Sequence, residues 1–276
     1  GSASRQLIEE SSESLAGRIG YLELTPFTSR EAENITELWI RGGFPKAYLA
    51  NTSRQSVLWR NAYIRTFLEQ DIPNLGIKIP PKHLHRFWMM LAHYHGQLFQ
   101  ASELGRSLSV SHHTTKKYLD ILEGTFMMRT LQPWHENIAK RQVKTVKVYF
   151  RDTGIFHTLL GINDKTALER HPKLGASWEG FALEELLRYY QVPSEQAYFW
   201  RTQTGAELDL LIHQQGVKRG FEFKYTERPK ITPSMRIALK ELKLDQVTIV
   251  YPGPHSYALD DHISVMSIEA LQAGTA

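Results

Sequence analysis

The stretch of residues 205–225 constrains the fold more than any other, because it predicts two strands joined by a tight turn at residues 214–216. Apolar and polar residues alternate on both sides of the turn, and strand residues point alternately to opposite faces. In the first strand, one face is predicted to carry Leu208, Leu210 and Ile212, and the other Glu207, Asp209 and Leu211. In the second strand, one face is predicted to carry Phe221, Phe223 and Tyr225, and the other Glu222 and Lys224.

Folding of this hairpin is expected to bring Asp209 close to Glu222 and Lys224 on one face. Two carboxylates suit Mg²⁺, which is usually held by one or two carboxylates together with water and substrate phosphate. Lys224 would then orient the attacking water or stabilise charge that develops on the phosphate. An ordinary solvated strand face with a salt bridge accounts for the same spacing, so both interpretations stay open at this point.

The four residues Asp209, Glu222, Phe223 and Lys224 follow the pattern D-x12-E-x-K, which resembles the PD-(D/E)XK motif of restriction-endonuclease-like nucleases. Leu208 stands where the motif's name has proline. The resemblance implies an αβββαβ core, hydrolysis of phosphodiester bonds, and Mg²⁺ or Mn²⁺ held by Asp209 and Glu222. It also implies a helix before the motif that carries a further glutamate.

Residues 177–190 predict that helix, with Ser177 as its N-cap. A core-facing stripe at helical spacing consists of Leu183, Leu186, Leu187 and Tyr190. Glu179 extends the stripe one turn earlier, and a carboxylate in such a place needs a partner. The predicted catalytic set is therefore Glu179, Asp209, Glu222 and Lys224. Strands at residues 197–202 and 246–251, a helix at 232–243 and a further strand near 263–266 complete this unit.

The middle of the chain predicts a winged helix-turn-helix. Helices are expected at residues 82–94 and 101–108, and a third helix starts after Ser111 and ends near Gly124 as its C-cap. Residues 126–131 and 143–150 then predict the strands of a wing, and residues 161–173 a surface loop. The candidate DNA contacts are His112, His113, Thr115, Lys116, Lys117, Lys140, Arg141 and Lys144, with Lys147 further along the wing. Because winged helices also bind proteins, a protein-interaction module is the alternative.

The N-terminal segments SSESLAGRIGYLEL, LWIRGGFPKAYLA and RNAYIRTFLEQDIP resemble the end of an AAA-type ATPase module and its helical lid. Helices are expected at residues 29–39 and 53–70. The resemblance is to bacterial and archaeal ATPases that carry a C-terminal domain of unknown function. It implies that Arg18, Gly42 and Gly43 lie near a nucleotide in the whole protein, although local turn and lid structure is the better explanation of them in this fragment. The phosphate-binding pattern GxxxxGK[ST] does not occur in this sequence, so ATP is expected only in the full-length parent.

The length of 276 residues suggests two or three domains, and the formal net charge of +4 permits a nucleic-acid partner. With no cysteine and no apolar run of membrane-spanning length, we expect a cytoplasmic protein without disulfides or membrane partners. The opening GSAS suggests a fragment, in which Gly1 and Ser2 could equally be a cloning remnant.

The predicted fold class is a multidomain α+β or α/β chain. Its parts are a helical AAA lid remnant at residues 1–78, a winged helix-turn-helix at 79–160 and an αβββαβ restriction-endonuclease-like domain at 161–276. The predicted function is that of a DNA-binding, divalent-metal-dependent nuclease-like module of an ATPase, with double-stranded DNA as partner. The alternatives are a catalytically inactive DNA- or protein-binding module, and an assembly module that forms homo-oligomers through the ATPase part.

Overall fold

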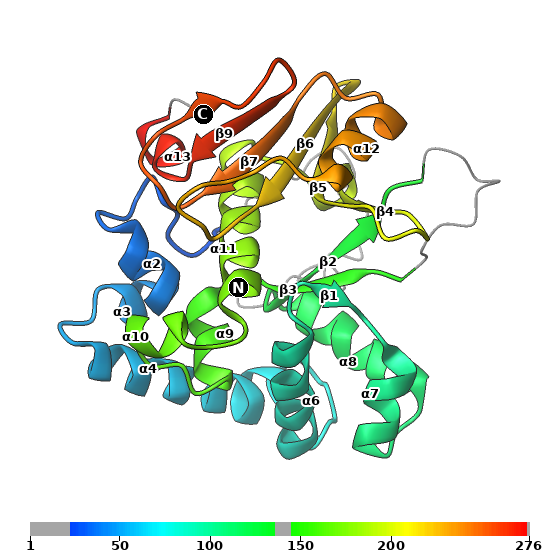
Figure 1. Cartoon of the computed structure of the whole chain (residues 1–276). Helices are drawn as coiled ribbons and strands as arrows, with labels where there is room; N and C mark the ends of the chain where they lie inside the picture. Colours follow the sequence, from blue (N-terminus) through cyan, green and yellow to red (C-terminus); the bar gives the residue numbers. More distant parts are fainter. Residues whose placement is uncertain (1–22, 136–144, 275–276) are drawn as a thin grey trace, which may run out of the picture.

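One nine-stranded mixed sheet runs through the computed structural model, which describes residues 23–135 and 145–274 (Figure 1). The strand order is β1-β3-β2-β4-β5-β6-β7-β9-β8. The strands are β1 (Gln97–Leu98), β2 (Met128–Pro133), β3 (Lys147–Phe150), β4 (Ala197–Arg201), β5 (Glu207–Gln214), β6 (Val217–Phe223), β7 (Val247–Tyr251), β8 (Tyr257–Ala258) and β9 (Ile263–Ser267). Within the described residues, no helix is both long and apolar enough to cross a membrane.

The N-terminal helices lie together on one side of the molecule (Figure 1). They are α2 (Ile35–Arg41), α3 (Pro45–Tyr48), α4 (Ser53–Thr66), the π-helix η1 (Phe67–Asp71) and α5 (Ile72–Asn74). The helix predicted at residues 53–70 is present, although its last turn is a π-helix. The helix predicted to begin at Ser29 begins at Ile35 instead, because the Asn34 side chain accepts a hydrogen bond from the backbone of Glu37 and caps the helix there.

The next three helices are α6 (Pro81–Tyr94), α7 (Ala101–Leu108) and α8 (His112–Gly124). With the short strand β1 between α6 and α7, and β2 and β3 after α8, the order is helix, strand, helix, helix, strand, strand. Ser111 caps α8 as predicted, since its hydroxyl accepts a hydrogen bond from the backbone of Thr114. The prediction of Gly124 as C-cap is wrong: Gly124 is the last helical residue and Thr125 follows as the cap, with its hydroxyl donating to the carbonyl of Ile121.

Two differences from the predictions lie between residues 153 and 190. The predicted loop at 161–173 contains a short helix, α10 (Lys165–Glu169), because the Asp164 side chain caps it. The long helix α11 (Leu174–Tyr189) begins before Ser177, so Ser177 is not its N-cap. Its buried hydroxyl instead accepts a hydrogen bond from Trp39 Nε1 and contacts His157 Nε2 in α9 (Thr153–Leu159).

The C-terminal part has the predicted order of one helix, three strands, one helix and one strand: α11, β4, β5, β6, α12 (Pro233–Leu242) and β7. Two apolar cores lie on opposite faces of this part of the sheet. Side chains of α11 and α13 (Glu269–Ala273) share one core with Leu210 and Phe221. Side chains of α12 share the other core with Leu208 and Leu211. The sheet is therefore covered on both sides (Figure 1).

The predicted alternation along the first hairpin strand is wrong at Leu208. Leu208 shares a core with Leu211, whereas Leu210 and Ile212 belong to the opposite core. The ladder between β4 and β5 shifts register between Tyr198 and Trp200, and such a bulge adds one residue and reverses the face of those beyond it. The turn is as predicted, with positive φ angles of 52° and 79° at Gln215 and Gly216.

The two halves of the sheet join through a parallel pair of β2 and β4, in which Gln132 faces Tyr198 and Pro133 faces Phe199. β2 also pairs antiparallel with β3. Strand β3 therefore lies two strands from β4 and three from β5. This arrangement lets side chains from residues 147–150 approach the hairpin.

Candidate functional site

The hairpin brings together the three residues that the spacing predicts. Lys224 Nζ lies 2.7 Å from Glu222 Oε2 and 3.7 Å from Asp209 Oδ2. The backbone N–H of Phe223 donates to Asp209 Oδ2 at 3.0 Å and fixes the orientation of that carboxylate. Asp209 and Glu222 are buried, while the Lys224 side chain is 37% exposed. The cluster therefore reaches solvent on the side of Lys224.

The fourth predicted residue, Glu179 of α11, lies in the same cluster through two residues of β3. Tyr149 donates its hydroxyl to Glu179 Oε1 at 2.6 Å. Lys147 Nζ lies 3.7 Å from Glu179 Oε1 and 3.9 Å from Asp209 Oδ1, and it also forms an ion pair with Glu207. We refer to the four carboxylates and two ammonium groups as the carboxylate–lysine cluster: Glu179, Glu207, Asp209, Glu222, Lys147 and Lys224.

Lys147 differs from its predicted place. The sequence places it with the basic residues of a wing, whereas its side chain is only 4% exposed and lies among carboxylates. In the sequence, Lys147 stands in the apolar run VKVYF, which indicates a buried strand. In the structure, all four residues of β3 are buried. A lysine in such a run needs acidic partners, so Lys147 was identifiable as a site residue, although its partners were not.

Burial, together with the crowding of the carboxylates, raises two of their pKa values. Burial and the negative charge of Asp209 raise the pKa of Glu179 to about 7 and that of Glu222 to about 8. Burial disfavours charge on the lysines as well, but the surrounding carboxylates raise the pKa of Lys147 and of Lys224 above the usual value for lysine. Both lysines are therefore charged at neutral pH, and the carboxylates exceed them in number.

When all four carboxylates are ionised, the cluster carries an excess of negative charge, and this excess fits a divalent cation. Asp209 and Glu222 supply the two hard oxygen ligands that Mg²⁺ commonly takes from a protein. Lys224 now lies between these carboxylates, and its exposed side chain has room to move aside. Within residues 23–135 and 145–274, no three His, Cys, Asp or Glu side chains form a preformed metal-binding group. The remaining ligands would come from water and a phosphate.

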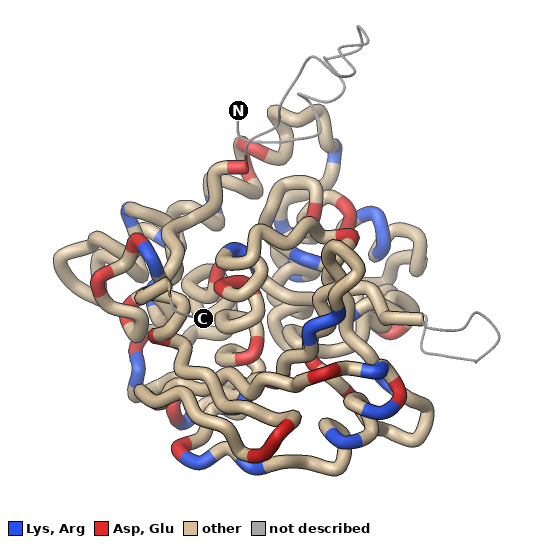
Figure 2. The backbone as a smooth tube through the Cα atoms, turned by 90° about the horizontal axis from the view of Figure 1, so that it is seen from above, with Lys and Arg blue, Asp and Glu red and all other residues tan. Residues whose placement is uncertain are grey.

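The predicted DNA-contacting residues of α8 divide between its surface and its core. The exposed residues are His112, His113, Lys116 and Lys117. Thr115 is buried and donates its hydroxyl to the carbonyls of Ala101 and His112, so its predicted contact with DNA is wrong because the hydroxyl is used inside the fold. The predicted wing residues Lys140, Arg141 and Lys144 lie outside the described residues. Elsewhere, basic and acidic residues are interspersed along the backbone (Figure 2).

The predicted nucleotide-proximal glycines form a tight turn against α9. The backbone N–H of Gly43 donates to Asp152 Oδ2 at 2.8 Å. Gly42 has a φ angle of 79°, and a side chain there would collide with the Asp152 carboxylate, which explains the glycine. The third residue, Arg18, lies outside the described part of the chain.

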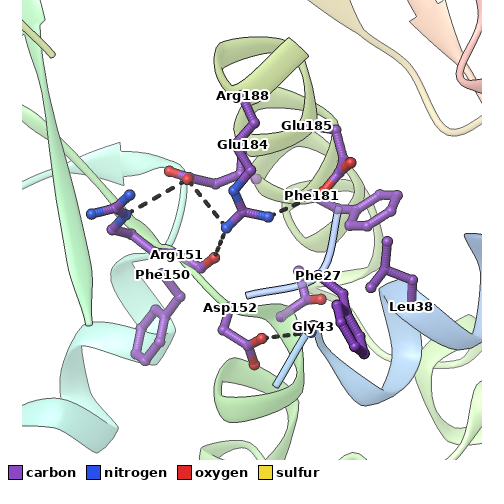
Figure 3. A pocket seen from close by; sticks show the side chains of 12 residues that line it. Phe27, Leu38, Gly43, Phe150, Arg151, Asp152, Phe181, Glu184, Glu185 and Arg188 are labelled. Atoms are coloured by element: carbon purple, nitrogen blue, oxygen red, sulfur yellow. Dashed lines mark hydrogen bonds and ion pairs between the residues drawn. The ribbon is translucent and has the colours of Figure 1, made fainter. Parts of the chain in front are cut away.

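A second buried charge cluster, which the sequence does not predict, surrounds Glu184 of α11 (Figure 3). Arg129 of β2 donates from Nε and Nη2 to the two oxygens of Glu184. Arg151 and Arg188 also form ion pairs with Glu184, at 3.7 and 3.6 Å. Burial alone would raise the pKa of Glu184, but the arginines lower it to about 2. Glu184 therefore links helix α11 by ion pairs to β2 and to the segment after β3.

Comparisons with known proteins place two domains of unknown function in this chain. Residues 32–166 match DUF8612, and residues 174–271 match DUF4143. Uncharacterized proteins of Mycobacterium bovis and Mycobacterium tuberculosis are each 49% identical to the chain over 265 residues. These matches cover 95% of this chain but only 60% of the relatives, so the chain spans about three fifths of their length. No solved structure matches it significantly.

Proposed function

Because the chain carries DUF8612 and DUF4143 domains around one carboxylate–lysine cluster, we propose that it is a DNA-binding, divalent-metal-dependent nuclease-like module of an AAA-type ATPase. DUF4143 domains often stand at the C-terminus of such ATPases. The observation that carries the proposal is the convergence of Asp209, Glu222 and Lys224 on one partly open site, joined by Glu179. Asp209, Glu222 and Lys224 come from one hairpin, but Glu179 comes from helix α11, and an ordinary solvated strand face does not require such a fourth residue.

Each residue has a distinct role in the proposed reaction. Asp209 and Glu222 would hold Mg²⁺ or Mn²⁺. The bound metal would lower the pKa of water and neutralise negative charge on the phosphate. Lys224, whose side chain is partly exposed, would contact the phosphate or orient the water. Glu179 would complete the acidic pocket, held in place by the hydroxyl of Tyr149.

The DNA-binding part of the proposal rests on helix α8. The order of α6, β1, α7, α8, β2 and β3, with β1 and β2 on either side of β3, supports the proposal of a winged helix. Lys116 and Lys117 lie exposed on α8, which follows the tight turn after α7. These two lysines would contact the phosphate backbone, which dominates DNA affinity.

A plasmid-nicking assay with Mn²⁺ tests the nuclease activity, using this chain and the longer parent protein. The wild type is expected to nick, and Asp209→Ala to lose nearly all activity, because a metal ligand and the attacking water act as one unit. Lys224→Ala should keep metal binding and lose cleavage, and Glu179→Gln should fall between. Glu227→Ala removes an exposed carboxylate close by in sequence and serves as the control.

Two results would argue against this assignment. Equal nicking by wild type and Asp209→Ala would trace the activity to a contaminant. A wild type that binds DNA and metal but never cuts would favour the second candidate, an inactive DNA- or protein-binding module. The observation that favours this second candidate is the short contact between Lys224 and Glu222, which already satisfies both groups without a metal.

A further inference from the structure

The carboxylate–lysine cluster contains two ammonium groups in very different surroundings. Lys224 is 37% exposed, whereas Lys147 is 4% exposed and lies over the ring of Phe199, with its Nζ 5.4 Å from the ring centroid. The strand neighbours of Lys147, Val148 and Tyr149, are fully buried. Lys224 can therefore leave its position by rotating toward solvent, whereas Lys147 cannot do so without opening the core.

Asp209 lies between these two ammonium groups. Its Oδ1 faces Lys147 Nζ at 3.9 Å, and its Oδ2 faces Lys224 Nζ at 3.7 Å. Beyond Lys224 lies Glu222, and beyond Lys147 lie Glu179 and Glu207. The cluster thus has two cation positions that share one carboxylate. In a two-metal site, two cations likewise occupy neighbouring positions.

We propose that Lys147 is a built-in cation that permanently fills the inner of these two positions, so that the site takes up one divalent metal ion rather than two. This inference rests on the proposed function, because it concerns the metal stoichiometry of the same site. It assigns a specificity-determining role to a residue that lies outside the D-x12-E-x-K pattern and comes from the segment that matches the other domain.

The charges in the cluster agree with a single metal. Four carboxylates face two ammonium groups, so the cluster carries two negative charges when every group is ionised, and one divalent cation neutralises them. If Lys147 loses its charge, Asp209 keeps its ion pair with Lys224 and Glu207 keeps that with Arg201, whereas Glu179 loses its ion pair with Lys147. A second divalent cation at the vacated position would then take over the neutralisation that Lys147 provides in the wild type. Buried charges without a partner are strongly disfavoured, so the empty position should attract that ion.

Metal analysis after equilibrium dialysis against Mn²⁺ tests the proposal on the full chain. The wild type is expected to hold one Mn²⁺ per chain, and Lys147→Met, which keeps an unbranched and only slightly shorter side chain without its charge, to hold two. Arg201→Met is the matched control, because Arg201 Nε also approaches Glu207, at 3.7 Å, but from a 40% exposed side chain outside the inner position. This control should hold one ion, like the wild type.

Thermal unfolding followed by circular dichroism supplies a second readout in case Lys147→Met folds poorly. Without metal, this variant should melt below the wild type, and saturating Mn²⁺ should raise its melting temperature more than that of the wild type. Electron paramagnetic resonance of the Mn²⁺-loaded variant should show a spin-coupled pair, and that of the wild type an isolated ion.

The outcomes separate this inference from the proposed function. One Mn²⁺ in both the wild type and Lys147→Met, or two in the wild type, would overturn the inference and leave the metal site of the proposed function intact. No Mn²⁺ in the wild type but one in Lys147→Met would overturn both the wild-type metal site of the proposed function and the one-metal stoichiometry inferred here. No Mn²⁺ in either protein, with equal melting shifts, would overturn both.

Discussion

Glu222 offers a test of the cluster that needs no substrate. Its pKa lies at about 8 in the folded chain, against an ordinary value of 4.5, because burial and the charge of Asp209 disfavour its ionised form. Between these two pH values, Glu222 therefore keeps its proton in the folded state and has lost it in the unfolded state, and this difference stabilises the folded state. The stabilisation is complete below about pH 4.5 and is lost as the pH rises through about 8.

The size of this effect follows from the shift. One pKa unit corresponds to about 1.4 kcal/mol, so a shift of this extent is worth on the order of 5 kcal/mol in the free energy of unfolding. Replacing Glu222 by glutamine keeps the shape of the protonated side chain and removes the titration. We expect the free energy of unfolding of the wild type to fall between about pH 5 and pH 9, and that of Glu222→Gln to fall by several kcal/mol less.

Urea unfolding at a series of pH values measures this difference, in a metal-chelating buffer. Glu227→Gln, an exposed carboxylate, is the control and should follow the wild type. Addition of Mn²⁺ at high pH should restore stability to the wild type, because metal ligands must be deprotonated and the metal then takes the proton's place. Parallel pH profiles for the wild type and Glu222→Gln would refute the account of the cluster given above.

Two further predictions concern other parts of the chain. Glu184→Gln should lower the free energy of unfolding by about 3–5 kcal/mol, because it leaves the buried Arg129 without its charged partner, and urea unfolding at neutral pH would measure the loss. An unchanged midpoint would contradict that role. The double variant Lys116→Ala and Lys117→Ala should lower the slope of log K against log salt for duplex DNA by about 0.9 for each lost phosphate contact. An identical slope, measured by fluorescence anisotropy, would favour a protein-binding role for α8.

The local elements follow closely from the sequence. The hairpin turn, helix α7 and the Ser111 cap agree with prediction because turn glycines, apolar spacing and capping hydroxyls act over a few residues. Ser177 shows where such reasoning fails. Its residue type fits a helix start, but its hydroxyl is used by Trp39 and His157, which are far away in sequence.

The residues of the candidate site also fall into two groups, those that local sequence patterns predict and those that depend on distant parts of the chain. Asp209, Glu222 and Lys224 are close in sequence, so hairpin geometry suffices to bring them together. The positions of the inner partners Lys147 and Tyr149 depend on the sheet order β3-β2-β4-β5. No local sequence pattern predicts that β2 pairs with β4. The sequence predicts the wrong face of the sheet for Leu208, because a bulge in an apolar strand has no clear sequence signal.

The pairing of β2 with β4 also bears on how such chains evolve. Residues 32–166 and 174–271 match separate domains, yet Lys147 of the first neutralises carboxylates of the second. A gene fusion that transferred only the second segment would inherit the acidic residues without their counter-charge, together with an unpaired β4 edge. Recombination should therefore preserve the two segments as one heritable unit, with substitutions at position 147 accompanied by changes at 179, 207 or 209.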